Sequence, residues 1–131
     1  MVSKKPIGNL PKRALTNIDL IKYVKKLKIP NFRGVYMRNN LPNHIWKSET
    51  GIINTDDKQN EATHWTAYIK RNKDILYLDS MGNLKPPREV IKYFKSDNSR
   101  NIIRYNHDRF QEYNTIKCGH MCLKFLYCYT R

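Results

Sequence analysis

The sequence has few acidic residues, few cysteines and no long apolar run. Eleven Asp and Glu stand against twenty-five Lys and Arg, which leaves a net charge of +14 over 131 residues. All three cysteines lie between Cys118 and Cys128, so a disulfide scaffold is disfavoured and a reducing compartment is expected. No apolar stretch approaches the roughly 20 residues of a membrane span, and the basic start lacks the apolar core of a signal peptide. We therefore expect a soluble, intracellular protein with no membrane partner.

The positive charge is the clearest signal in the composition. A charge of +14 on a chain of this size attracts polyanions and makes their binding depend on salt, so DNA, RNA and acidic proteins are plausible partners. The same excess of Lys and Asn can reflect coding bias and simply solvate the surface. The charge is spread over several segments, and no sequence-specific nucleic-acid motif is present. Both interpretations stay open.

Length and chain punctuation predict one folded domain behind a short arm. Residues 1–14 are basic and carry Pro6, Gly8 and Pro11, which predicts a loosely packed N-terminal arm. Residues 15–131 are enough for one hydrophobic core and too few for two. We expect this domain to be monomeric.

Apolar spacing predicts an α+β fold in which a small mixed or antiparallel sheet packs with helices. Helical spacing appears in "TNIDLIKYVKKLKIP", with Leu20, Ile21, Val24 and Leu27 as its apolar face, in "KPPREVIKYFK", and in "CGHMCLKFLYCYT". Strands are predicted in "GIIN", at about 64–70 and 75–79, and in "NIIRYN". The two middle strands form a predicted hairpin, so His64 opens one strand and Asp79 closes its neighbour.

Cys118 is the candidate nucleophile. A thiol attacks as a thiolate, and its free pKa of about 8.5 must be lowered by a helix N-terminus, a paired imidazole, or both. Cys118 stands where the last helix should begin, and Gly119 leaves room for a substrate backbone. A histidine held by a carboxylate is the usual partner base, and adjacent antiparallel strands can bring His64 and Asp79 into hydrogen-bond reach.

Acyl transfer also needs donors aimed at the oxyanion, commonly a backbone N–H of the nucleophile and a side-chain amide. Gln111, seven positions before Cys118, could supply that amide. His, Asp, Gln and Cys in this order therefore fit one reaction, acyl transfer at an amide or isopeptide carbonyl.

The pattern resembles a known family. "GIINTDD", "THWTAY", "LYLDSMG" and a Gln separated by six residues from "CGHMCLKFL" resemble the adenovirus-type, adenain-like maturation proteases, a branch of the Ulp1/SENP cysteine-protease superfamily. The resemblance covers nearly all of residues 15–128. "DSMG" is closer to the Ulp1-like side, whereas the spacing from Gln111 to Cys118 is that of the viral side.

The resemblance implies a role for each residue. His64 would be the general base, Asp79 its orienting carboxylate, Cys118 the nucleophile, and Gln111 with the Cys118 N–H the oxyanion hole. Trp65 would flank the substrate groove, and Gly119 is the second groove residue. The adenoviral enzymes continue well beyond the catalytic helix, and a basic peptide cofactor attaches there through a cysteine that "NIIRYN" lacks. Covalent activation by such a peptide is therefore not carried over, whereas activation by DNA is implied by the family.

Plainer interpretations compete for several of these residues. A metal site on Cys118, His120 and Cys122 would need a fourth ligand, and helical spacing points the three to different sides, so no metal is expected. Cys122 and Cys128 are expected to pack inside the helix.

Other residues could fill the same roles or none. His44 and His107 are expected in loops or on the surface, with His107 the one competitor for the base. Asp74 is a weaker substitute for Asp79. Trp65 could be a core aromatic as well as a groove residue.

The sequence thus predicts a cysteine endopeptidase, a viral or virus-derived maturation protease. It would cleave capsid or core precursors at Gly-containing small-residue sites, with no cofactor required for the chemistry and possible activation by DNA or a peptide. The expected location is the virion and the host cell interior, in the nucleus or a viral factory. Two alternatives remain: a Ulp1-type peptidase that removes ubiquitin-like modifiers, and a non-catalytic, basic, nucleic-acid-binding packaging protein on the same fold.

Overall fold

A five-stranded mixed sheet forms the centre of the computed structural model, which describes residues 10–55, 64–97, 100–108 and 117–130. The strands follow chain order across the sheet: β1 Phe32–Met37, β2 Ser48–Asn54, β3 Trp65–Arg71, β4 Asp74–Leu78 and β5 Ile102–Tyr105. The three helices are α1 Asn17–Lys26, α2 Arg88–Phe94 and α3 Cys118–Tyr129. β2, β3 and β4 pair antiparallel, whereas each edge strand pairs parallel with its neighbour.

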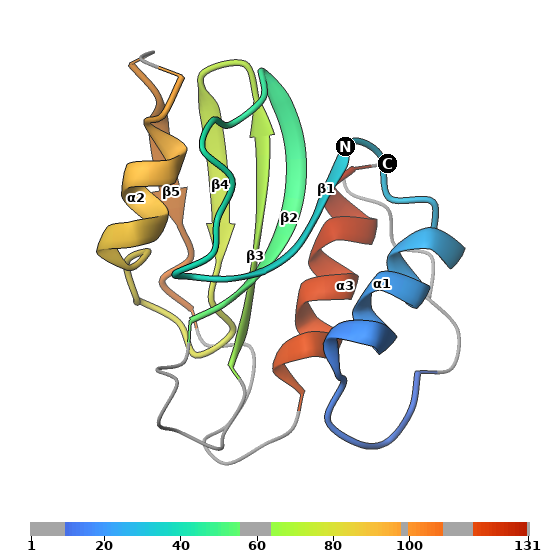
Figure 1. Ribbon diagram of the computed structural model, residues 1–131. Coiled ribbons are helices and arrows are strands. Elements are labelled where there is room, and N and C mark those ends of the chain that lie inside the picture. Colours follow the sequence, from blue (N-terminus) through green and yellow to red (C-terminus); the bar gives the residue numbers. More distant parts are fainter. Residues whose placement is uncertain (1–9, 56–63, 98–99, 109–116, 131) are drawn as a thin grey trace.

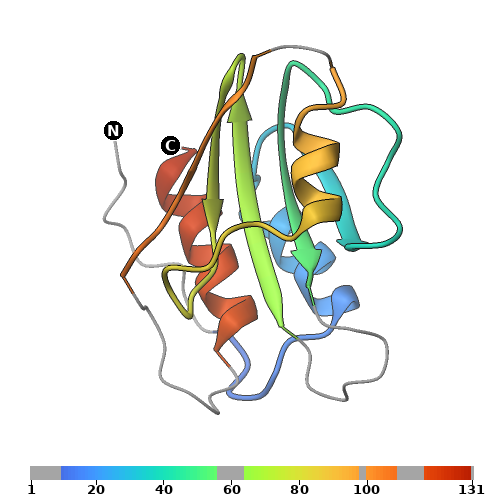
Figure 2. The same cartoon turned by 90° about the vertical axis from the view of Figure 1, so that its left-hand side faces the viewer.

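Helices cover both faces of the sheet (Figure 1). One core lies between the sheet and α1 with α3, and its fully buried members include Leu20, Ile52, Ala67, Leu123 and Leu126. A second core lies between the other face and α2, and its fully buried members include Ile53, Tyr68, Val90 and Phe94. Figure 2 shows α2 and α3 on opposite sides of the strands. Ile52 and Ile53 point to different cores because successive strand residues face opposite ways.

The predicted hairpin is present, with β3 and β4 within one residue of their expected bounds. Arg71 pairs with Asp74, which leaves Asn72 and Lys73 as a two-residue turn. Asn72 has a φ of 56°, a left-handed conformation that asparagine tolerates better than most residues and that tight hairpin turns require. The turn therefore sets a register that runs without a break to Ala67 and Leu78.

α1 begins where the sequence indicates, although its apolar face is narrower than predicted. Thr16 caps the helix: Asp19 N–H donates to the Thr16 hydroxyl, and Thr16 N–H donates to the Asp19 carboxylate at 2.9 Å. Leu20 and Val24 are buried as predicted, but Ile21 is 50% exposed, which corrects its assignment to the core face. The helix is short and contacts the core along one narrow stripe, so Ile21 falls outside it.

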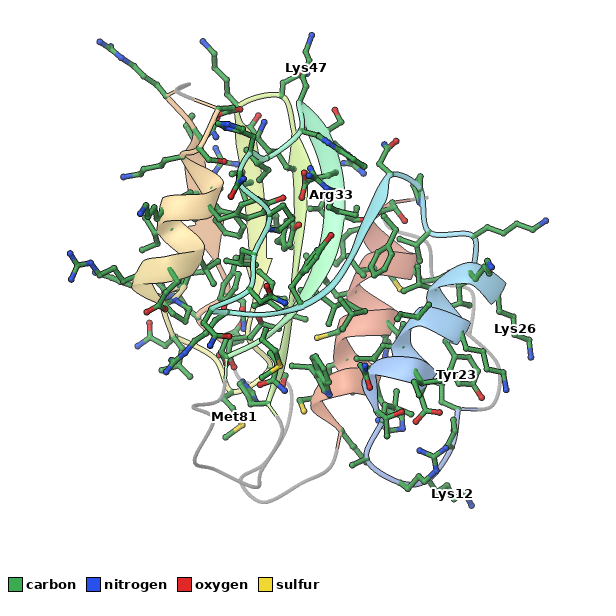
Figure 3. All side chains as sticks on the ribbon, viewed as in Figure 1. Lys12, Tyr23, Lys26, Arg33, Lys47 and Met81 are labelled. Carbon is green, nitrogen blue, oxygen red and sulfur yellow. The ribbon has the colours of Figure 1, made fainter. Side chains whose placement is uncertain are left out.

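Residues at the start of the domain lie against the core that α1 and α3 cover. Leu15 is buried, and Leu10 packs against the same cluster. Lys12, by contrast, is exposed, and with Lys26 and Lys47 it extends away from the ribbon (Figure 3). The boundary between an arm and a domain at residue 14 stays a prediction, although Leu10 already packs against the core.

A buried carboxylate joins the second core to β1 and β2. Glu49 is completely buried and accepts hydrogen bonds from the Trp46 N–H at 2.7 Å, the Arg33 guanidinium at 3.1 Å and the Tyr93 hydroxyl at 2.6 Å. The Tyr68 hydroxyl donates to it as well. Burial and the neighbouring carboxylate raise the pKa of Tyr68 well above its ordinary value, so this tyrosine stays a donor. The sequence had not marked Glu49 as special.

We predict that Glu49→Gln destabilises the fold by about 2–3 kcal/mol, because the amide leaves Arg33 without its counter-charge and offers one fewer acceptor to the buried donors. Urea denaturation followed by circular dichroism measures the loss. Glu89→Gln, an equivalent change at an exposed carboxylate, is the control and should stay within about 0.5 kcal/mol of the parent. Equal effects of the two changes would contradict a structural role for the buried carboxylate.

Candidate active site

Three chain segments end or begin together at one end of the sheet. His64 directly precedes β3, Asp79 directly follows β4, and Cys118 is the first residue of α3. In Figure 1 the start of β3, the end of β4 and the start of α3 all lie at the lower end of the molecule. The hairpin brings the first two residues together because antiparallel strands place the start of one beside the end of the next.

His64 and Asp79 form a hydrogen-bonded pair. His64 Nε2 lies 2.8 Å from Asp79 Oδ1, with the His64 side chain 21% exposed and that of Asp79 6% exposed. The Asp79 carboxylate is itself held, because Oδ1 accepts the Met81 N–H at 3.0 Å in the turn that follows β4. Since Nε2 is used by Asp79, Nδ1 is the ring nitrogen left for the thiol. The structure thus joins the two predicted residues with one nitrogen of the imidazole still available.

Cys118 completes the group. It is buried and forms a hydrogen bond with His64. Burial by itself lowers the pKa of His64, but the hydrogen bonds to Asp79 and Cys118 and the charges of both raise it, and the balance raises the pKa of His64 to about 10. The imidazole is therefore protonated at neutral pH. A protonated imidazole next to sulfur at a helix N-terminus favours a negatively charged nucleophile.

The other two cysteines lie deeper in α3. Cys122 stands one turn after Cys118 and is 1% exposed. Burial raises the pKa of Cys122 well above its ordinary value, and the nearby Cys118 and Asp79 add to the effect. Cys128 is buried toward the other end of the same helix. Among the described cysteines, Cys118 is therefore the one that is hydrogen-bonded to His64.

Trp65 and Gly119 pack against each other inside the domain. Trp65 is 5% exposed, and its Nε1–H donates to the Leu15 carbonyl at 3.1 Å. A Cβ on Gly119 would lie 3.1 Å from Leu15 Cβ and 3.4 Å from Trp65 Cδ1. The space that Gly119 leaves is thus filled by Leu15 and Trp65, which gives both predicted groove residues a packing role. Their contact with substrate stays a prediction.

The competing histidines lie elsewhere. His107 is exposed and its Nδ1 contacts Asn83 Oδ1 at 2.9 Å, while His44 is exposed with Nδ1 3.2 Å from the Ser96 carbonyl. His120 follows Cys118 in α3, but its Nε2 contacts the Pro11 carbonyl at 2.6 Å. None of these three rings is hydrogen-bonded to a carboxylate in the part of the chain that the structure describes.

The remaining predicted positions lie apart from this group or outside the described residues. Asp74 lies at the start of β4, the far end of that strand from Asp79. Gln111 lies outside the described residues, so the oxyanion-hole assignment stays a prediction. Within the described ranges, no group of three or more His, Cys, Asp or Glu side chains is arranged to hold a metal ion. No helix among them is both long and apolar enough to cross a membrane.

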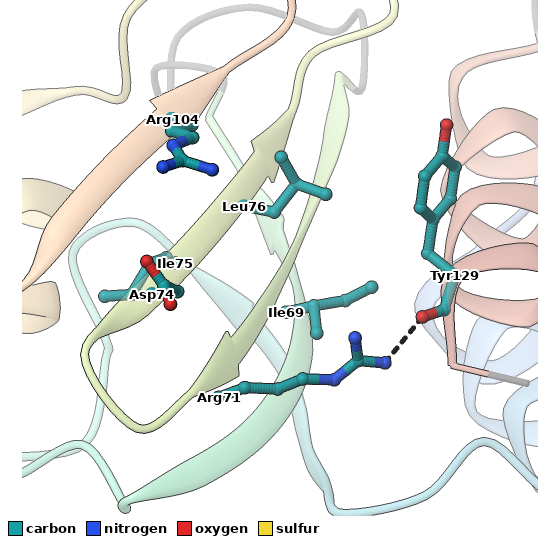
Figure 4. Close-up of a pocket in the computed structure, with 7 residues that line it drawn as sticks. All are labelled: Ile69, Arg71, Asp74, Ile75, Leu76, Arg104 and Tyr129. Carbon is teal, nitrogen blue, oxygen red and sulfur yellow. Dashed lines mark hydrogen bonds between the residues drawn. The ribbon is translucent and has the colours of Figure 1, made fainter. Parts of the chain in front are cut away.

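A shallow groove lies at the opposite end of the sheet (Figure 4). It has a volume of about 260 Å³, and its lining consists of Ile69, Arg71, Asp74, Ile75, Leu76, Arg104 and Tyr129. Arg71 donates to the Tyr129 carbonyl at 2.6 Å across it. The groove lining contains no cysteine and no histidine, so it lacks the residues of the candidate active site.

Sequence reasoning missed one residue at the site. Asn106 directly follows β5, and its side-chain amide is hydrogen-bonded to both backbone groups of Asp79. A single polar residue after a strand is ordinary turn chemistry, and only the sheet order places it beside β4.

Comparisons with known proteins support the fold. No protein-family model matches the chain, and no curated protein matches significantly in sequence. In structure, the chain is similar to the ASFV pS273R protease, with a TM-score of 0.60 and 16% sequence identity over 96% of this chain and 61% of that one. The chain thus spans about three fifths of the length of that protease.

At this identity the likeness is one of fold. It confirms the prediction of an α+β fold, which the chain shares with a neighbour of Ulp1-like cysteine-protease fold. It does not distinguish the adenovirus-type branch, which stays a prediction.

We predict that Asp79→Asn lowers the pKa of His64 from about 10 toward its ordinary value near 6.5, because the charge of Asp79 and its hydrogen bond both raise it. NMR titration of the imidazole carbons measures the shift. Because the folded pKa is the higher one, the stabilisation from protonated His64 is complete below about pH 6.5 and is lost as pH rises toward 10.

The fall in unfolding free energy between these pH values should accordingly be smaller in Asp79→Asn than in the parent. Asp74→Asn, at the other end of β4, is the matched control and should titrate like the parent. A His64 pKa that is the same in both variants would show that Asp79 does not hold the imidazole.

Proposed function

We propose that this protein is a cysteine endopeptidase that uses Cys118, His64 and Asp79. The observation that carries the proposal is the 2.8 Å hydrogen bond between His64 Nε2 and Asp79 Oδ1. Cys118, the first residue of α3, is hydrogen-bonded to the same imidazole. Nucleophile, base and orienting carboxylate in contact are the arrangement required for acyl transfer. The structural likeness to a viral protease agrees with it.

In the first step the Cys118 sulfur attacks the carbonyl carbon of the scissile bond. His64 already carries a proton at neutral pH, and it gives that proton to the leaving nitrogen. The C–N bond breaks, an amine leaves, and a thioester remains on Cys118. In the second step neutral His64 takes a proton from water, which attacks the thioester and releases the acid.

The coupling between sulfur and imidazole helps the proton transfer. Cys118 is one of the causes that raise the pKa of His64. Once the sulfur has bonded to the carbonyl carbon in the tetrahedral intermediate, it carries no negative charge and the pKa of His64 falls. The imidazolium therefore becomes a stronger acid at the point where the leaving nitrogen needs a proton, while Asp79 keeps the ring in place.

The oxyanion of each tetrahedral intermediate needs preorganised donors. We assign this role to the Cys118 backbone N–H and the Gln111 side-chain amide. Support comes from the position of Cys118 as the first residue of α3, where helix N–H groups have no partner within the helix, and from the seven-residue spacing to Gln111.

We propose viral or virus-derived maturation as the setting, with capsid or core precursors cleaved at Gly-containing small-residue sites. The resemblance to adenain-like proteases and the fold shared with the ASFV pS273R protease support it. The virion and host cell interior, in the nucleus or a viral factory, are the corresponding location. The competing peptidase function is removal of ubiquitin-like modifiers, which "DSMG" favours.

We predict that Cys118→Ala and His64→Ala each abolish hydrolysis of Gly-containing fluorogenic peptides, because they remove the nucleophile and its proton carrier. Cys128→Ala, which removes another buried thiol of α3, should keep hydrolysis at the parent level. Release of fluorophore at pH 7 is the measurement, and the same assay with a capsid precursor and with a ubiquitin-like conjugate separates the two peptidase functions. Undiminished hydrolysis by Cys118→Ala would show that the mechanism is wrong.

DNA binding is the second proposal, and it also covers the non-catalytic alternative. Lys22, Lys25 and Lys26 are exposed along α1. Asp19, the acidic residue of that helix, is already paired with Arg13 at 2.6 Å. Among the described residues, no ion pair is formed by the lysines of α1, and such an exposed basic surface attracts phosphates. DNA bound there would hold the protein close to core precursors bound to the same DNA, which raises their local concentration.

We predict that replacing Lys22, Lys25 and Lys26 together by Gln weakens binding to duplex DNA and lowers the slope of log affinity against log salt by about 2–3. The control is Lys85, Lys92 and Lys95→Gln, an equal change of charge on the side of α2, where Glu89 and Asp97 lie nearby in sequence. Fluorescence anisotropy at several salt concentrations measures both. Binding that does not depend on salt would refute the polyanion proposal.

A further inference from the structure

The side chain of Asn106 clamps the backbone of Asp79. Asn106 Oδ1 accepts the Asp79 N–H at 2.8 Å, and Asn106 Nδ2–H donates to the Asp79 carbonyl at 2.6 Å. One planar amide thus satisfies both backbone groups of the residue that holds His64. These are short, reciprocal hydrogen bonds of the kind that normally occur between paired strands.

The clamp begins where the β-ladder stops. β4 and β5 pair in parallel, and the last pair in their register is Tyr77 with Tyr105. Asp79 and Asn106 come just after this end, so the amide takes over the pairing that backbone groups would otherwise supply. Asp79 is therefore tied to β5 by a side chain rather than by a continuing strand.

Asn106 is itself held in place. Its carbonyl accepts the Asn83 N–H at 2.9 Å, and its Nδ2 also donates to the Asp108 carbonyl at 2.9 Å. Asn83 in turn contacts His107 Nδ1 through Oδ1 at 2.9 Å. The turns after β4 and after β5 are thus interlocked, with Asn106 bonded to both.

We propose that Asn106 is a positioning residue of the catalytic group: it fixes the backbone of Asp79, and through it the direction of the carboxylate that orients His64. The inference rests on the proposed function, since it concerns the same site. Asn106 does not contact the reacting atoms. A displacement of about 1 Å at a catalytic group can cost about 100-fold in rate, so a clamp on Asp79 affects the chemistry without touching substrate.

The chemistry of the clamp requires an amide of this length. Alanine loses both hydrogen bonds, and aspartate keeps an acceptor but loses the donor to the Asp79 carbonyl while adding a negative charge. Asn101, just before β5, offers a matched comparison, because its Nδ2 also donates to a backbone carbonyl, that of Phe94, at 2.5 Å. It does so at the opposite end of β5 from the catalytic group.

The test is a double-mutant cycle on the reactivity of Cys118. The rate of Cys118 alkylation by iodoacetamide at pH 7 is measured by peptide mass spectrometry, which separates it from Cys122 and Cys128. We expect Asn106→Ala and Asn106→Asp to slow it by about 10–100-fold. Asp79→Ala should slow it at least as much, and adding Asn106→Ala to Asp79→Ala should change nothing further, because Asn106 acts through Asp79.

The control Asn101→Ala should react within about twofold of the parent, which separates positioning from a general loss of stability. Thermal unfolding checks that each variant is folded. If Asn106→Ala does not fold, the alkylation rate of Asn106→Asp is used to test the proposal. The proposal is overturned if the folded Asn106 variant is alkylated as fast as the parent. It is also overturned if the fold-decrease in rate caused by Asn106→Ala multiplies in full with that caused by Asp79→Ala in the double mutant. Alkylation needs no substrate, so the two proposals can fail separately. If the protein hydrolyses no peptide but the variants show the expected alkylation rates, the peptidase function is refuted and the positioning role of Asn106 is supported.

Discussion

The antiparallel pairing of β3 with β4 is the constraint on which the site depends. The two-residue turn at Asn72 and Lys73 sets the register, and the register decides that His64 and Asp79 emerge at the same end of the sheet. A slip of one residue would turn every side chain of a strand to the other face. It would then place Leu78 and Ala67 in the wrong core and separate the imidazole from its carboxylate. The register of the hairpin therefore also brings His64 and Asp79 together.

The third member of the site comes from a different layer. α3 packs on β3, and the contact of Gly119 with Leu15 and Trp65 sets how closely its first turn approaches the strand that follows His64. The same Trp65 donates a hydrogen bond to the Leu15 carbonyl, so the chain leading into α1 also packs against the start of α3. The thiol is thus placed by apolar packing, whereas the histidine and carboxylate are placed by strand pairing.

Much of this could be predicted because the signals are local. The capping residues of α1, the prolines ahead of α2, the hairpin and the start of α3 at Cys118 all follow from short-range patterns. The parallel pairing of both edge strands could not be predicted, because it depends on which distant segments meet. The roles of Glu49 and Asn106 could not be predicted from the sequence for the same reason. Each is an ordinary polar residue whose hydrogen-bond partners are brought to it by the order of the strands in the sheet. Ile21 shows the opposite error, in which helical spacing overstates burial on a short helix with one covered side.

At the end of β5 the chain must both hold the Asp79 backbone and turn out of the sheet toward α3. Continuing the β4–β5 ladder would hold Asp79 firmly, but β5 would then run on in the sheet direction. The chain must instead leave the sheet after residue 105 to reach α3 and deliver Cys118. An asparagine at this point holds the Asp79 backbone through its side chain and leaves its own main chain free to turn. With backbone pairing alone, the chain could not both hold the Asp79 carboxylate in place and turn away to bring Cys118 to it. The side-chain amide of Asn106 allows both.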